Sequence, residues 1–175
     1  MNELLIEALS PFQLPLANKF YRVEGSKMRA RRDEQVWIAR LDGKIVAALR
    51  FRSCGGWQTS IDGFYPDSAE PACRAWLDGH WLLGVFTATD YRDRGIARAL
   101  ISAGIAKAGG PVWLFCQPNL GSFYSRLGFV AALALPEPLA SRLEGYRRSQ
   151  QLDAWVWLED AKTPGHQRHQ DTSLG

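Results

Sequence analysis

A turn rich in charge and glycine is the first feature of the sequence that could do chemistry. Residues 81–88 form an apolar run that predicts a buried strand, and Gly95 opens an amphipathic segment that predicts a helix. Between them lies Arg92-Asp93-Arg94. The first amides of a helix have no partner within the helix, and the helix dipole adds positive charge there. The turn therefore predicts a site for an anion such as a pyrophosphate.

Two common phosphate-binding motifs do not describe this turn. It has no Gly-Lys pair followed by Ser or Thr, which excludes a P-loop, and it lacks the glycine triplet of dinucleotide-binding folds. An ordinary strand-to-helix turn with solvated arginines is the competing interpretation. The turn alone leaves the two interpretations open.

A second segment, about thirty residues downstream, places an aromatic pair before a glycine. It reads Phe-Tyr-Ser-Arg-Leu-Gly-Phe over residues 123–129. The two segments in this order resemble the GNAT superfamily of N-acetyltransferases. The superfamily's [Arg/Gln]-x-x-Gly-x-[Gly/Ala] signature is matched at Arg92, Gly95 and Ala97, and its Phe-Tyr-x-x-Leu-Gly-Phe signature at 123–129. The close match covers about residues 81–131.

The resemblance implies a co-substrate and the residues that hold it. Members transfer an acetyl group from acetyl-coenzyme A to an amine. The pantetheine arm lies between the fourth and fifth strands, which splay apart, and the pyrophosphate sits on the turn. An asparagine before the second motif often contacts the cofactor. Carried over to this sequence, the expected cofactor-binding residues are Val85, Phe86, Thr87, Arg92, Asp93, Arg94, Gly95, Ile96, Ala97 and Asn119.

The resemblance also implies a catalytic acid at Tyr124, because the family's tyrosine at this position often protonates the departing thiolate. A phenol with an ordinary pKa of ~10 can do so when it is well positioned. No serine has glycines two before and two after it, and Cys116 ends a predicted buried strand, where a core role is the favoured interpretation. We therefore expect direct attack by the amine, with the oxyanion stabilised by strand amides.

The base that would deprotonate the amine is not identified by the sequence. Many members use a glutamate on the fourth strand, but residues 81–88 contain no carboxylate. Asp90, His80, Asp62 and Glu34 are the alternatives, and a chain of water molecules is another.

The elements predicted around these segments form one α/β domain over residues 1–160. Asp42-Gly43, between two runs rich in β-branched and aromatic residues, predicts a hairpin of strands at 35–41 and 44–52. The other predicted strands lie at 4–6, 81–88, 112–116, 129–133 and 153–159, and the helices at about 11–23, 68–77, 95–108, 119–127 and 136–151. This order predicts a GNAT-like, mixed, mostly antiparallel sheet of about seven strands flanked by helices. Residues 161–175 turn polar and are expected to be a disordered tail.

Composition and charge limit the partners. The chain has 175 residues, a net charge of +3 and 46% hydrophobic residues, which is ordinary for a globular protein. No apolar run approaches the ~18 residues that cross a bilayer and no secretory signal is visible, so we expect a cytoplasmic protein without a membrane partner. Three widely spaced cysteines predict neither disulfides nor a metal site. We expect a small-molecule or peptide amine as substrate and no nucleic-acid partner, with monomer and homodimer both open.

Two other functions stay open. A GNAT-fold module that binds coenzyme A without catalysis, such as a sensor, is favoured by the missing strand carboxylate and opposed by Tyr124. An acetyltransferase that acts on a macromolecule, either charged tRNA or a protein N-terminus, is supported only by the arginines of residues 29–32. The tryptophans of residues 53–81 could wall the acceptor pocket or cover the core, and the sequence does not decide between these roles.

Overall fold

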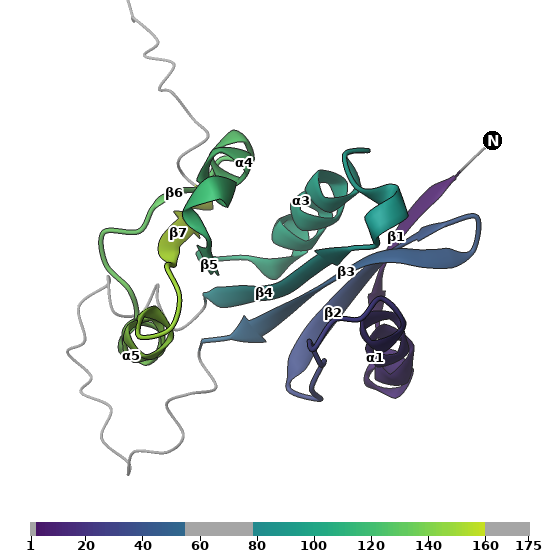
Figure 1. The fold of residues 1–175 in the computed structure, drawn as a ribbon, viewed down its shortest axis with the longest axis horizontal. Coiled ribbons are helices and arrows are strands. Elements are labelled where there is room, and N and C mark those ends of the chain that lie inside the picture. The colour runs from purple at the N-terminus through teal and green to yellow at the C-terminus, as the bar shows by residue number, and fades with distance from the viewer. Residues whose placement is uncertain (1–2, 55–78, 160–175) are drawn as a thin grey trace, which may run out of the picture.

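A seven-stranded sheet forms the centre of the computed structural model, which describes residues 3–54 and 79–159 (Figure 1). The strands are β1 (Leu4–Leu9), β2 (Glu34–Leu41), β3 (Lys44–Ser53), β4 (His80–Thr87), β5 (Val112–Cys116), β6 (Val130–Ala131) and β7 (Asp153–Trp157). Their order across the sheet is β1-β2-β3-β4-β5-β7-β6. Only β4 and β5 pair in parallel. The predicted mixed, mostly antiparallel sheet is confirmed.

Helices cover both faces of the sheet. They are α1 (Leu14–Val23), α3 (Ile96–Ala108), α4 (Gly121–Arg126) and α5 (Glu137–Arg147), with short 3-10 turns η1 (Pro11–Gln13), η3 (Thr89–Tyr91) and η4 (Pro118–Leu120). Figure 1 shows α3 and α4 on one side of the sheet and α1 and α5 on the other. The buried side chains form three clusters beneath these helices. One lies beneath α3 and α4, one beneath α1 and one beneath α5.

The local signals of the sequence explain where several elements begin and end. Asp42 and Gly43 both adopt positive φ, at 50° and 79°, as the tight turn between β2 and β3 requires. Helix α3 begins directly after Gly95, whose φ is 75°, and ends at Gly109, whose φ is 68°. The helical segment at the N-terminus starts as the turn η1 at Pro11 and becomes α-helical at Leu14.

Three predicted elements extend two or more residues beyond their observed ends, and one of them is β7, which ends at Trp157 instead of residue 159. Strand β6 has two residues instead of the predicted 129–133, because only Ala132 continues the bonding to β7 and Leu133 is fully exposed. Helix α5 ends at Arg147 instead of residue 151. The amides of Ser149 and Gln150 bond back to the Tyr146 carbonyl, and this turn reverses the chain into β7.

Some predictions fall outside the described residues. The helix expected at 68–77 and the tail at 161–175 are among them, so both stay predictions. Trp81, at the edge of the tryptophan-rich region, is buried in the cluster beneath α5 and serves the core. No helix within residues 3–54 and 79–159 is long and apolar enough to cross a membrane.

The sheet opens between its two central strands. β4 and β5 pair only at His80 with Val112 and at Trp81 with Trp113. Gly84 then takes a φ of 63°, and the register of β4 against β3 shifts at this point. Past the shift, the edge of β4 that faces β5 pairs with no strand of the described residues, as the resemblance to the GNAT superfamily implied.

Candidate active site

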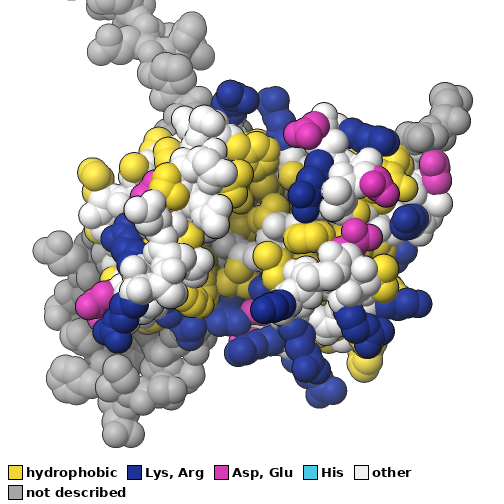
Figure 2. All heavy atoms as spheres, viewed as in Figure 1, with side chains coloured by type: hydrophobic (Ala, Val, Ile, Leu, Met, Phe, Trp, Pro, Cys, Tyr) yellow, Lys and Arg dark blue, Asp and Glu magenta, His cyan; other side chains and the backbone are white. Residues whose placement is uncertain are grey.

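A cleft of about 470 Å³ lies where β4 and β5 separate, beside the start of α3 and the helix α4. Figure 2 shows a hollow near the middle of this face with hydrophobic side chains along it. The residues that line the cleft are Val85, Phe86, Thr87, Tyr91, Arg92, Asp93, Gly95, Ile96, Ala97, Arg98, Leu120, Phe123 and Tyr124. Segments that are far apart in the sequence therefore meet in one cavity.

The structure brings together all but two of the site residues predicted from the sequence. Arg94 does not line the cleft, and its guanidinium lies over the Tyr91 ring at 5.3 Å from the ring centre. Asn119 is exposed in η4, and its neighbour Leu120 lines the cleft in its place. Four lining residues were not predicted, namely Tyr91, Arg98, Leu120 and Phe123. Phe123 stands inside the second motif, so its position was already a signal.

The start of α3 gives one end of the cleft its capacity to hold an anion. The first helical bond joins the Ala99 amide to the Gly95 carbonyl at 3.0 Å, so the amides of Ile96, Ala97 and Arg98 have no backbone acceptor among the described residues. A Cβ on Gly95 would meet no atom of the described chain within 4 Å, which leaves the turn open to a ligand.

Arg92 adds positive charge at the same end and is held in place. Its Nε donates to the Thr87 carbonyl at 3.2 Å, and its guanidinium lies over the Phe86 ring at 5.6 Å from the centre. These contacts fix the η3 turn against the end of β4. The guanidinium is therefore oriented before any ligand arrives.

The open edge of β4 forms one wall of the cleft that Tyr124 also lines. Phe86 and Thr87 pair with Ala48 and Ala47 of β3 on one edge, and their other edge faces the cleft. Backbone amides and carbonyls on such an edge are strong hydrogen-bonding groups that a chain with amide groups can satisfy.

A buried polar network holds the bend of β4 from behind. The Tyr21 hydroxyl donates to the Gly84 carbonyl at 2.7 Å, and a Cβ on Gly84 would lie 2.5 Å from Nε of Arg50. Arg50 and Arg52 both bond the Glu34 carboxylate, at 2.9 and 2.5 Å. Sequence reasoning missed this network, because its members come from α1, β2, β3 and β4 and only the fold brings them together.

The same network changes the interpretation of Glu34. Its side chain is 0% exposed, and its carboxylate also accepts from the Arg31 amide at 3.0 Å. Two guanidinium groups and an amide already occupy this carboxylate, and its burial shields it from an amine substrate. Glu34 is therefore a structural residue and not the missing base.

Tyr124 lies in the cleft with its ring packed against other aromatic rings and its hydroxyl protonated. The residue is 7% exposed, and its ring meets the rings of Phe123 and Phe129 at centre distances of 5.0 and 5.6 Å. Burial, with a smaller contribution from the thiol of Cys116, raises the pKa of Tyr124 to about 12. No hydrogen bond joins its hydroxyl to another side chain or carbonyl of residues 3–54 and 79–159. The phenol is therefore neutral at physiological pH.

Cys116 has the properties of a core residue, as the sequence indicated. It is buried at the end of β5, and burial, with a contribution from Asp153, raises its pKa to about 11. The thiolate is the nucleophilic form, and a raised pKa keeps the thiol protonated at neutral pH. This result agrees with direct attack and disfavours a covalent acyl-cysteine.

The remaining candidates for the base are not placed in the cleft. Asp90 is exposed in η3 and does not line the cavity, while His80 lies at the far, paired end of β4 with its ring edge-on to Phe51. Asp62 lies outside the described residues. Asp93 is the one carboxylate among the described lining residues.

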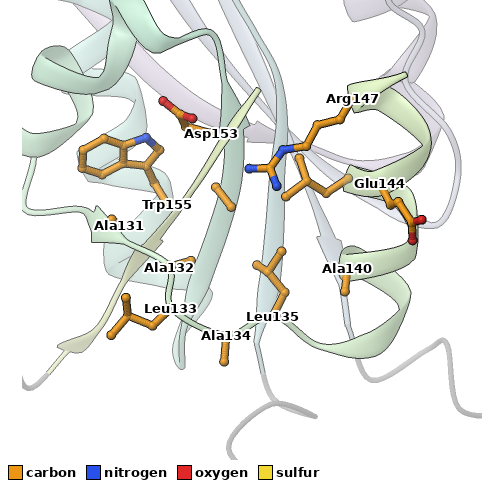
Figure 3. Close-up of a pocket in the computed structure, with 12 residues that line it drawn as sticks. Ala131, Ala132, Leu133, Ala134, Leu135, Ala140, Glu144, Arg147, Asp153 and Trp155 are labelled. Carbon is orange, nitrogen blue, oxygen red and sulfur yellow. The ribbon is translucent and has the colours of Figure 1, made fainter. Parts of the chain in front are cut away.

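A second cavity, of about 560 Å³, lies between α5, β7 and the segment 131–135. Figure 3 shows Trp155 and Asp153 on its β7 side, with Arg147 reaching across from α5. Alanine and leucine side chains make up most of the wall, and Nε of Arg147 is already bonded to the Leu152 carbonyl at 2.9 Å. Neither Tyr124 nor the α3 turn lines this cavity, so we assign the chemistry to the cleft at β4.

The family of the chain follows from a comparison with protein families. A model of the acetyltransferase (GNAT) domain matches residues 32–131, which is more than half of the chain. The chain therefore belongs to the GNAT acetyltransferase family. No curated protein sequence matches it.

Solved structures share the fold at low sequence identity. A ribosomal-protein alanine N-acetyltransferase of Escherichia coli superposes with a TM-score of 0.55 and 16% identity, over 95% of this chain and 99% of that chain. A GNAT acetyltransferase of Staphylococcus aureus gives 0.55 and 14%, over 89% and 99%. N-acetylglutamate synthase of Neisseria gonorrhoeae, solved with coenzyme A and N-acetyl-glutamate, gives 0.55 and 16%, over 89% of this chain and 35% of that longer chain. These similarities establish the fold.

Proposed function

We propose that the protein transfers an acetyl group from acetyl-coenzyme A to an amine by direct attack. The observation that carries the proposal is that one cleft combines the open edge of β4, the unbonded amides at the start of α3 and the Tyr124 side chain. Membership of the family supports the reaction class, and the N-acetylglutamate synthase of similar fold binds coenzyme A.

The cleft matches the chemistry of coenzyme A along its length. The amides of Ile96, Ala97 and Arg98, with the guanidinium of Arg92, would hold the pyrophosphate. The backbone of residues 85–87 would bond the amides of the pantetheine arm. When bound, the co-substrate supplies the acetyl group as a thioester.

The residues nearest the thioester position have two tasks. Tyr124 keeps a proton on its hydroxyl at neutral pH and would give it to the departing sulfur. The bend at Gly84 turns β4 away from β5, and strand amides next to the bend would stabilise the charge that develops on the carbonyl oxygen. The rigid network behind Gly84 keeps these amides in place without rearrangement.

The substrate is an amine of a small molecule or a peptide, and its proton has to leave before attack. An aliphatic ammonium with pKa ~10 is mostly charged at neutral pH. The described walls of the cleft hold no carboxylate apart from Asp93, so water is the simplest acceptor of this proton.

The absence of a carboxylate from residues 81–88 favours one alternative function, a module that binds coenzyme A and catalyses no reaction. Its binding cleft would be the same, so only turnover separates the two functions. Release of free thiol from acetyl-coenzyme A, measured across a panel of primary amines, should show turnover with at least one acceptor. Tight coenzyme A binding without release on any amine or peptide of the panel would favour the silent module.

A binding experiment tests the position of the site independently of turnover. Coenzyme A should raise the melting temperature of the parent, because a ligand that binds only the folded state stabilises it by about 2.7 kcal/mol at 100 times Kd. Gly95→Glu should abolish this gain by placing bulk and negative charge at the phosphate position.

Gly25→Glu is the matched control. Gly25 lies just after the end of another helix, α1, with a similar positive φ, 72° against 75°, and a Cβ there also meets no atom within 4 Å. This variant should keep the full coenzyme A shift. Equal shifts in both variants would show that the anion site is elsewhere.

A further inference from the structure

Positive charge is concentrated in one short segment of the chain. Residues 19–32 contain six lysines and arginines and one acid, Glu24, whereas the whole chain has a net charge of only +3. The rest of the chain is therefore slightly acidic, and the modest net charge hides a strongly uneven distribution. All six basic residues are exposed, and they are Lys19, Arg22, Lys27, Arg29, Arg31 and Arg32.

These residues line a groove between α1 and the segment that follows it. Two clefts, of about 790 and 700 Å³, share Pro15, Asn18 and Arg29 and so run into each other. Among the residues that the structure describes, no carboxylate lines either cleft. In Figure 2, Lys and Arg side chains gather at the lower edge of the molecule, where Figure 1 places α1 and the chain after it. We call this surface the basic groove.

The basic side chains of the groove have no polar partner within the described part of the protein. None of its six side chains forms a salt bridge or hydrogen bond with residues 3–54 or 79–159, whereas Arg40 pairs with Glu7 and Arg50 pairs with Glu34. Among the nearby acids, Glu34 is committed to Arg50 and Arg52. Asp33 is 65% exposed, and its closest cation is Arg52 at 3.8 Å.

The backbone under these charges is fixed. Asn18 accepts from the Ala30 amide at 2.7 Å and donates to the Ala30 carbonyl at 3.3 Å. The Arg31 amide bonds Glu34, and the Ser26 amide bonds the Tyr21 carbonyl at 2.8 Å. The basic side chains therefore project from an ordered scaffold, which lowers the entropy that a ligand has to remove on binding.

We propose that the basic groove binds a single-stranded nucleic acid through its phosphodiester backbone. Guanidinium groups match phosphate oxygens in charge and geometry, and four of them together with two lysine ammonium groups form an electrostatic track for a polyanion. Phe12 lines the same groove and is 94% exposed, so its ring offers a stacking face to a base. A concave groove suits a chain better than the flat surface of a bilayer, and the exposed ring favours nucleobases over an acidic peptide.

This proposal revises the expectation of no nucleic-acid partner, which rested on the mild net charge. It does not depend on acetyl transfer, because the basic groove shares no lining residue with the cleft at β4. A failure of one function in experiment therefore says nothing against the other.

Fluorescence anisotropy with a labelled single-stranded RNA of about 12 nucleotides, and with the same sequence as DNA, tests the proposal. We expect the parent to bind, with an affinity that falls roughly 20–100-fold between about 50 and 200 mM salt, as for three to five neutralised phosphates. Equal binding of RNA and DNA would assign recognition to the backbone, and preference for RNA would add the 2′-hydroxyl as a contact. Absence of salt-sensitive binding to either oligonucleotide would overturn the proposal.

Two pairs of variants separate a defined site from general electrostatics. The triple variant Arg29→Ala, Arg31→Ala, Arg32→Ala should weaken binding roughly tenfold or more and flatten the salt dependence. Its control, Lys107→Ala, Arg126→Ala, Arg148→Ala, removes the same charge from exposed positions elsewhere and should bind within about twofold of the parent. Equal weakening by both triples would contradict a site at the groove.

Phe12→Ala should weaken oligonucleotide binding about fivefold or more, while Leu16→Ala, exposed on the same helical segment outside the groove, should not. Melting temperatures near that of the parent show that each variant is folded. A parent that prefers poly-glutamate or anionic phosphatidylglycerol vesicles to the oligonucleotide would overturn the assignment to nucleic acid.

Discussion

Tyr124 shows how burial prepares a weak acid for a specific task. Its raised pKa ensures that the phenol carries its proton, but it also makes the phenol a weaker donor. A thiolate that departs into the same apolar cleft is desolvated too, and this raises its own affinity for a proton. The two shifts act in the same direction, so the proton transfer from the phenol to the thiolate stays feasible.

Tyr124→Phe removes the hydroxyl and keeps the ring contacts with Phe123 and Phe129, so the fold should survive. Loss of a general acid should lower kcat by about 10²–10⁴-fold with little change in coenzyme A affinity, because the interaction develops in the transition state. Steady-state kinetics with an amine accepted by the parent measure the effect. Parental turnover by the folded variant would assign Tyr124 to packing alone.

The pKa of Tyr124 also makes a prediction about the alkaline side of the pH–rate profile. kcat/KM should rise between about pH 7 and 9, because more of the amine becomes neutral. It should not fall through loss of the acid below pH 10, because the phenol titrates near 12. Initial rates in a constant-ionic-strength buffer series give this profile. A decline with a midpoint near pH 8 in the folded protein would show that another group is the acid.

At the scale of elements, close approach of α3 to the sheet depends on one glycine. A Cβ on Gly104 would lie 2.5 Å from a ring atom of Phe51, which is fully buried on β3. An aromatic ring in a packed core has little room to shift. The distance between α3 and β3 is therefore set by the missing side chain, and with it the position of the anion site at the start of α3.

Gly104→Ala and Gly145→Ala form a matched pair inside two helices. Gly104→Ala should destabilise the protein by about 1–3 kcal/mol through overpacking against Phe51. Gly145→Ala should stabilise it by about 0.5–1 kcal/mol, because a Cβ there meets no atom within 4 Å and alanine favours the helix. Urea unfolding of both variants measures the difference. Two changes of the same sign would contradict the packing described for α3.

Elements with local signals were predictable from the sequence, and elements without them were not. Asp42-Gly43 determined the β2–β3 turn, and Gly95 and Gly109 bracketed α3, because each needs a backbone conformation that few residues adopt. The ends of β6 and α5 were wrong because an alanine-rich stretch and a polar stretch carry no stop signal. Their ends are set by pairing with β7 and by the turn after Tyr146.

The residues of the candidate site also fall into two groups, those that could be predicted from the sequence and those that could not. Residues of the two motifs, such as Arg92 and Tyr124, were found because order and spacing recur in the family. Tyr21 and Arg50, which hold the bend at Gly84, were missed because they contact it across 63 and 34 residues of sequence. Long-range polar contacts of this kind depend on tertiary structure and leave no periodic pattern in the chain.

At the scale of the whole molecule, the shape of the cleft depends on the rigidity of the core. The two parts of the sheet join through only two residue pairs of β4 and β5, so the core on either side has to be rigid for the cleft to keep its shape. Several ionisable groups are buried in that core in their neutral forms. Burial raises the pKa values of Tyr21, Cys54, Cys116 and Tyr124. Packing of the protein is thus linked to the protonation of these groups.

This linkage predicts that the protein loses stability in alkali. The folded-state pKa values of Cys54, Cys116 and Tyr124 are raised to about 12, 11 and 12, from ordinary values of 9.0, 9.0 and 10.0. Below about pH 8 both states keep these protons, so stability is insensitive to them. As pH rises above about 8, the unfolded chain releases protons that the folded chain retains, and the free energy of unfolding falls.

Urea unfolding at pH 7.5, 9, 10 and 11 should therefore show a progressive loss of stability, on the order of several kcal/mol by pH 11 when the three shifts are combined. Removing one group should flatten the decline while leaving the other groups to act. Cys54→Ala is suited to this, because Cys54 lies in the cluster beneath α5, away from the cleft residues, and its shift is due to burial alone. The difference between parent and variant should grow from pH 9 to 11. A parent equally stable across this range, or a variant that follows the parental decline without change, would show that the Cys54 thiol titrates normally in the folded state.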